Sequence, residues 1–108
     1  MGLNKITEKI LNKQIEAEAV SSHLYLAMAI WAETNGYSGT SAFLYRHTDE
    51  ERMHMLKLIK FVNERGGHGV VPTLKQPPVT FKSVKSVFEE ILKHEMSVTA
   101  DINNLVDA

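Results

Sequence analysis

Three carboxylates and one histidine occupy positions where a helix should carry residues of the core. Glu18 lies in I-E-A-E-A-V-S-S-H-L-Y, Glu51 in D-E-E-R-M-H and Glu95 in I-L-K-H-E-M-S-V. The flanking apolar residues recur at helical spacing, which places each charge on the buried side of its helix. Burying one unpaired carboxylate costs on the order of several kcal/mol, so three are tolerable only if they share a partner. A bound cation is the simplest such partner.

The pair Glu51 and His54 has the spacing of two metal ligands on a helix. Residues three apart lie on one helix face, so a carboxylate oxygen and an imidazole nitrogen can reach one ion. The pair alone is weak evidence for a metal site, because many solvent-exposed helix faces contain Glu-x-x-His by chance. Leu44, Leu58 and Phe61 place it on the buried side. Carboxylates with one imidazole and no thiolate suit iron or manganese better than structural zinc.

Tyr25 lies two helical turns after Glu18 on the same stripe. Its hydroxyl could hydrogen-bond a metal ligand or its ring could lend an electron. An ordinary core tyrosine with a satisfied hydroxyl is an equally good interpretation.

The other histidines carry weaker signals. His23 is expected at the surface or at an interface, and His68 in a solvent-exposed glycine-rich loop. His47, one turn before Glu51, is expected in a structural role, with contact to a metal ligand as the alternative. His94 adjoins the predicted ligand Glu95 but points about 100° away around the helix.

Composition limits the function classes. The chain has 108 residues, a net charge of -1 and no cysteine. These features predict a single domain without a disulfide framework, with no electrostatic attraction to nucleic acid. No segment is long and apolar enough to span a bilayer, and the first residues lack a signal-peptide core, which predicts a cytoplasmic protein.

The residue pattern predicts an all-α fold with three long helices over about 4–34, 41–65 and 83–106. The first two are joined by a short connection and should be antiparallel. Three prolines and three glycines exclude a helix from the loop 66–82. Some 16 extended residues reach about 50 Å, longer than a helix of about 37 Å, so the third helix should start at the far end and run parallel to the second.

The first helix is apolar on two faces, which suggests that one face packs in the core and the other forms a subunit interface.

The motifs L-N-K-Q-I-E-A-E-A-V-S-S-H-L-Y, A-F-L-Y-R-H-T-D-E-E-R-M-H and L-K-H-E-M resemble the bacterial non-haem ferritins over essentially the whole chain. The resemblance implies a di-iron ferroxidase centre in a ferritin-like bundle with a long crossover loop. Glu18 would hold one iron, His54 would complete its site, Glu51 would bridge both irons and Glu95 would hold the second.

The same resemblance assigns two further residues and a reaction. Glu50 matches a glutamate that serves an additional iron site, and Tyr25 matches the tyrosine beside the centre. The implied reaction is oxidation of Fe(II) by dioxygen or peroxide, with ferric mineral stored in a homo-oligomeric cage. Haem is not expected, because Arg52 stands where a haem-binding ferritin has its methionine.

In the family a fourth helix follows and supplies ligands near the second iron. Three helices alone should leave an apolar groove and a weaker second site, so either the chain is shortened or another chain fills the groove. A non-catalytic helical interaction module is therefore the alternative function. A rubrerythrin-like peroxidase is less favoured, since no Cys-x-x-Cys motif is present.

Overall fold

The computed structural model describes the backbone of residues 2–107 and the side chains of residues 2–96. It contains three helices, α1 (Lys5–Thr34), α2 (Ser38–Glu64) and α3 (Val84–Asp107), and no strand within the described backbone. The predicted all-α architecture is therefore confirmed. None of these helices has the length and apolarity needed to cross a membrane.

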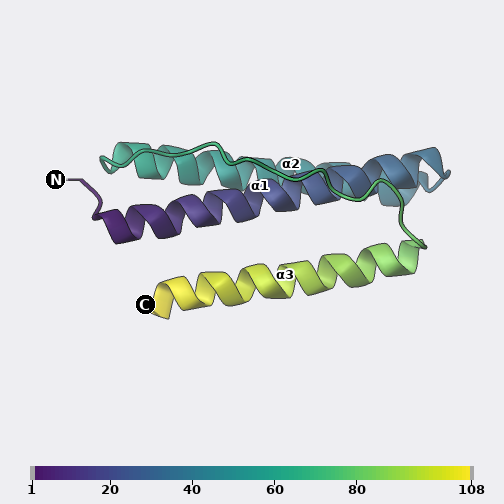
Figure 1. Cartoon of the computed structure of the whole chain (residues 1–108). Coiled ribbons are helices and arrows are strands. Elements are labelled where there is room, and N and C mark those ends of the chain that lie inside the picture. Colours follow the sequence, from purple (N-terminus) through teal and green to yellow (C-terminus); the bar gives the residue numbers. More distant parts are fainter. Residues whose placement is uncertain (1, 108) are drawn as a thin grey trace.

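Helices α1 and α2 form an antiparallel hairpin (Figure 1). Asn4 caps α1 by accepting a hydrogen bond from the Thr7 amide at 2.9 Å. The helix ends at Asn35, and Gly36 makes the turn with φ at +82°, a conformation that glycine adopts without a steric cost. Helix α2 begins at Ser38 rather than near Ser41, because Gly39 lies in its first turn without interrupting it.

The segment 66–82 runs as an extended strap along the hairpin to its far end (Figure 1). Gly66 starts it with φ at +84°. The side chain of Asn12 then holds the strap against α1, since it accepts from the Val70 amide at 2.8 Å and donates to the His68 carbonyl at 3.0 Å. Because the strap follows the hairpin to its far end, α3 begins there.

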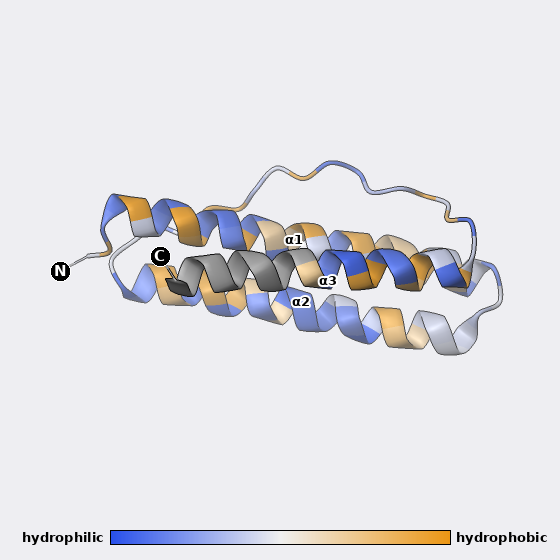
Figure 2. Ribbon diagram, turned by 90° about the horizontal axis from the view of Figure 1, so that it is seen from below, coloured by the Kyte–Doolittle hydropathy of each residue, from blue (hydrophilic) through white to orange (hydrophobic). Residues whose placement is uncertain are grey.

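Helix α3 starts at the far end and runs parallel to α2, as the loop length predicted (Figure 1). Ser83 and Ser86 cap it reciprocally, each hydroxyl accepting the other's amide at 3.1 Å. In the view from below, the coloured part of α3 passes in front of α1 and α2 and lies between them (Figure 2).

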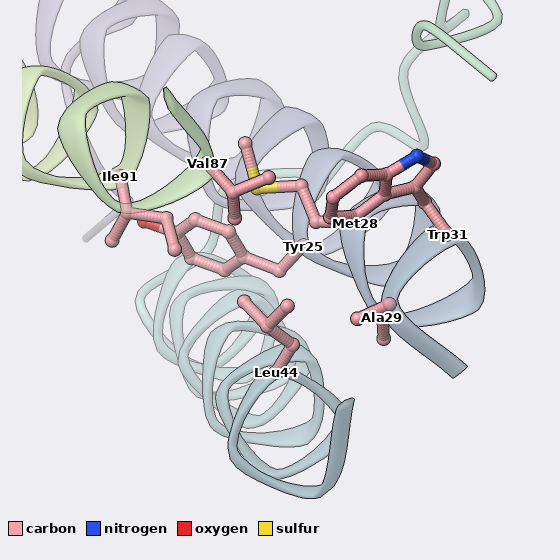
Figure 3. Packing of buried hydrophobic residues seen from close by; sticks show 8 residues of the cluster. Tyr25, Met28, Ala29, Trp31, Leu44, Val87 and Ile91 are labelled. Atoms are coloured by element: carbon pink, nitrogen blue, oxygen red, sulfur yellow. The ribbon is translucent and has the colours of Figure 1, made fainter. Parts of the chain in front are cut away.

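The core consists of two apolar clusters separated along the bundle axis. The larger cluster surrounds Tyr25 and joins all three helices, as Figure 3 shows for Met28, Leu44 and Val87. The smaller cluster, nearer the start of α1, is formed by Leu11, Ile15 and Val62. Glu18 lies between these two clusters along α1. Its carboxylate is therefore flanked by apolar regions on both sides along the bundle axis.

Candidate metal centre

Glu18 is buried on α1, and one of its carboxylate oxygens lacks a hydrogen-bond partner. Only 5 % of the residue is exposed. Oε1 accepts a hydrogen bond from the side-chain amide of Gln14 at 3.2 Å, whereas the buried Oε2 has no partner. A buried acceptor without a donor is costly and requires an explanation. A cation at Oε2 would supply one.

Glu51 and His54 of α2 face this orphaned oxygen. The Nδ1 atom of His54 lies 3.8 Å from Glu18 Oε2 and 3.8 Å from Glu51 Oε2. The three side chains form one group in which each offers a ligand atom within 4.8 Å of the others. Glu51 is buried as predicted, but the His54 side chain is 52 % exposed. The expectation that both are buried was therefore wrong for His54, because a step of three residues rotates about 60° off the buried stripe.

Glu95, from α3, belongs to a second group together with Glu51 and His47. Its Oε1 lies 3.6 Å from His47 Nε2 and accepts a short hydrogen bond from the Tyr25 hydroxyl. The Glu95 side chain is 39 % exposed, so it is less buried than the sequence pattern predicted.

His47 is a candidate ligand that the sequence analysis missed. It was expected in a structural role, but it stands in the second group of potential ligands. The available signal was its spacing, because residues i and i+4 share a helix face and His47 precedes Glu51 by four. What could not be seen was that Glu95 of α3 approaches the same ring.

Glu50 lies at the edge of the site. Its side chain is 62 % exposed, and its Oε2 is 3.6 Å from His47 Nδ1. It belongs to neither ligand group among the described side chains. His23 and His68 are exposed and also stand outside both groups.

His94 takes part in the attachment of α3 to α1. Its Nε2 is hydrogen-bonded to the hydroxyl of Ser21, and its ring stands edge-on to Tyr25 with centroids 6.0 Å apart. Because Ser21 donates its own proton to the Ala17 carbonyl at 2.9 Å, its oxygen accepts from His94. His94 thus points toward α1 beside the ligand Glu95.

The crowding of carboxylates changes the proton affinity of Glu51. Burial raises the pKa of Glu51 to about 8, and the neighbouring carboxyl of Glu18 adds to the shift, followed by Glu95 and Glu50. Burial and the hydrogen bond to Glu95 likewise raise the pKa of Tyr25 well above its ordinary value. Without a cation nearby, the ionised form of Glu51 is therefore disfavoured.

The two groups share Glu51 and together offer carboxylate oxygens and imidazole nitrogens from all three helices. Oxygen and imidazole ligands suit divalent ions such as Fe(II) and Mn(II). A carboxylate common to two groups can bridge two ions and reduce their mutual repulsion. The orphaned oxygen of Glu18 and the raised pKa of Glu51 both indicate that positive charge fits this position.

Comparison with known proteins agrees with this geometry. The ferritin family model, described as a ferritin-like domain, matches residues 8–108. The chain is 42 % identical over 105 residues to a bacterial non-heme ferritin of Campylobacter jejuni. The aligned region covers 97 % of this chain and 63 % of the relative. It is 40 % identical over 104 residues to a probable bacterial non-heme ferritin-like protein of Haemophilus influenzae, covering 96 % and 63 %.

Solved structures show the same backbone. An open pore ferritin from the archaeon Archaeoglobus fulgidus superposes with a TM-score of 0.93 at 36 % identity, over 98 % of this chain and 65 % of that one. A ferritin of Chlorobium tepidum gives 0.93 at 38 % identity, over 97 % and 64 %. The chain thus spans less than two thirds of the length of these proteins. The matching family model, the sequence identities and the shared backbone establish that the chain belongs to the ferritin family.

Proposed function

We propose that this protein takes up Fe(II) at the two ligand groups, oxidises it and passes it to storage as ferric mineral. The observation that carries the proposal is the buried, unpartnered Oε2 of Glu18, which faces Glu51 and His54. Iron is the substrate, and the family membership supports it over other divalent ions.

Each side chain has a part in this proposal. Glu18 and His54 hold the first Fe(II), Glu95 holds the second, and Glu51 bridges both. Tyr25 positions Glu95 through its hydrogen bond. Glu51 releases its proton when iron binds, because the positive charge reverses the effects that raise its pKa.

The electron balance requires a pair of irons. Two Fe(II) ions give up two electrons, and dioxygen takes up two electrons and two protons to become hydrogen peroxide. Peroxide can replace dioxygen as the oxidant, taking up two electrons and two protons to become two waters. Holding two ions next to one bridging carboxylate delivers both electrons together.

Storage of the product requires an assembly, and the outer face of α1 supports one. Val20, Leu26 and Ile30 of α1 are exposed apolar residues, and Val79 of the strap is exposed as well. Such a face fits contact between subunits. We expect a native mass, measured by light scattering, many times that of one chain.

The test is aerobic Fe(II) oxidation followed by absorbance of the ferric product. Glu51→Gln and His54→Ala are each expected to slow the rapid phase at least about tenfold, because each removes a ligand of the first ion. Glu89→Gln is the matched control, since Glu89 is exposed on α3 and, among the described side chains, pairs only with Lys85. Rates that stay unchanged in both site variants would overturn the proposal.

A second candidate function, binding another helix, is favoured by a row of exposed apolar residues on α3. Phe88, Leu92 and Met96 are spaced by four residues, and Leu92 is 64 % exposed. If this were the chain's role and the glutamates had none, Fe(II) would not bind stoichiometrically. Iron stoichiometry therefore separates the two functions.

A further inference from the structure

The ring of His47 lies between two carboxylates from different helices. Its Nε2 is 3.6 Å from Glu95 Oε1 on α3, and its Nδ1 is 3.6 Å from Glu50 Oε2 on α2. The side chain is 25 % exposed, against 52 % for His54. Of the two imidazoles in the ligand groups, His47 is therefore the better shielded from water.

Two aromatic rings hold the imidazole in this orientation. Tyr25 lies with its centroid 5.0 Å away at an interplanar angle of 57°, and Phe43 stacks on it at 5.2 Å and 21°. Phe43 is itself packed against Phe88 of α3, with centroids 5.8 Å apart. The ring is thus held in place before any ligand arrives, as an efficient binding site requires.

The two distances of 3.6 Å exceed those of direct hydrogen bonds, which fall at about 2.7–3.2 Å. Two atoms that each bind one ion at about 2.0–2.2 Å lie about 3–3.7 Å apart when the angle between them is about 90–120°. The Nε2 of His47 and Oε1 of Glu95 have this separation. Glu51 contributes the third ligand atom of the group, all within 4.8 Å.

We propose that His47 Nε2 binds the second cation together with Glu51 and Glu95, and that the negative charge of Glu50, 3.6 Å from Nδ1, favours the tautomer with its proton on Nδ1. A ligating histidine usually donates its other nitrogen to a carboxylate, which fixes the tautomer. The inference deepens the proposed function and rests on it. It also departs from the family resemblance, which gave Glu50 an iron of its own and His47 no role.

This assignment gives both cations the same donor set. Glu18 and His54 serve the first, Glu95 and His47 serve the second, and Glu51 is shared. An imidazole on each ion favours Fe(II), Co(II) or Zn(II) over Mg(II) and Ca(II), which prefer oxygen ligands. The second cation site therefore disfavours Mg(II) and Ca(II).

Anaerobic titration with Co(II), followed by its visible absorption, tests the inference without relying on activity. The wild-type protein is expected to bind two Co(II) per chain, each with a nitrogen ligand. His47→Leu should weaken the second step at least about tenfold and leave the first unchanged. Glu50→Gln should weaken the second step less, because Glu50 acts on the ring only through its charge.

Proton NMR of the Co(II)-loaded protein supplies a second readout. Two exchangeable imidazole N–H signals with large paramagnetic shifts are expected, one from each ligating histidine. His47→Leu should remove one of them, whereas His68→Leu, the matched control at an exposed loop position, should remove neither. Circular dichroism checks the fold, and His47→Gln replaces His47→Leu if the leucine variant does not fold.

The outcomes distinguish the inference from the function on which it rests. If the His47 variants bind two Co(II) with unchanged spectra and both imidazole signals, the inference is wrong and the proposed function stands. If wild-type protein binds no Co(II) and no Fe(II), the proposed function itself fails.

Discussion

At the scale of single residues, the main feature is the raised pKa of Glu51 in the absence of a cation. Its carboxyl is 7 % exposed and has other carboxylates nearby, which together raise its pKa to about 8 from 4.5. A cation bound beside Glu51 would lower that pKa again. Binding and proton release are coupled for this reason.

The raised pKa of Glu51 predicts how stability depends on pH without metal. Between about 4.5 and 8, the folded state retains a proton that the unfolded state has lost, so rising pH disfavours folding through this group. Its favourable contribution is fully present below 4.5 and is lost as pH passes 8. Relative to Glu51→Gln, the wild-type free energy of unfolding should fall by at most about 1.4 kcal/mol per pH unit.

Urea unfolding at pH 5, 6.5 and 8.5 in the presence of a chelator measures this difference. Glu89→Gln serves as the control, because Glu89 is exposed and should leave the pH profile parallel to the wild type. A parallel profile for Glu51→Gln would contradict the raised pKa.

The sequence predicted the candidate residues on α1 better than those on α2. Helical spacing places Glu18 and Tyr25 on a buried stripe, and the structure buries both. The spacing could not reveal that His47 approaches Glu95, because that contact depends on how α3 crosses the hairpin. It also could not reveal that His54 lies at the margin of the stripe, half exposed.

At the scale of helices, two adjacent residues of α3 attach it to α1. His94 donates a hydrogen bond to the hydroxyl of the buried Ser21, and Glu95 accepts one from the hydroxyl of the buried Tyr25. Apolar packing adds Val87 and Ile91 on the α3 side. The position of the candidate ligand Glu95 therefore depends on these polar contacts as well as on the core.

Ser21→Ala is expected to loosen α3. The change leaves His94 Nε2 without its partner in a partly buried position, which costs about 1–3 kcal/mol. Hydrogen exchange of the α3 amides should become faster, while α1 and α2 stay protected.

Ser22→Ala is the matched control, because Ser22 is also buried on α1 but bonds the Thr48 carbonyl of α2. It should not accelerate exchange in α3. Equal acceleration by both substitutions would show that the contact between Ser21 and His94 has no specific role.

The arrangement of the helices followed from the sequence more directly than the site did. Loop length and turn residues predicted that the segment 66–82 returns along the hairpin, and the structure has this path (Figure 1). The start of α2 was less predictable, because glycines near residue 39 resemble a turn. The partners of the strap, such as Asn12, required the folded structure, since they lie far away in sequence.

At the scale of the whole molecule, three helices bring their carboxylates to one point between two apolar clusters. The molecule is elongated, with extents of 52 × 23 × 21 Å, so the site is near the surface despite its buried glutamates. A cation bound there links all three helices and should stabilise the fold as well as the site.

The most direct test of this account is anaerobic calorimetric titration with Fe(II) at pH 7 in two buffers of different ionisation enthalpy. We expect two Fe(II) per chain, proton release on binding because positive charge lowers the pKa of Glu51, and no stoichiometric binding by the double variant Glu18→Gln/Glu51→Gln. Absence of binding by the wild-type chain, or equal binding by the double variant, would contradict it.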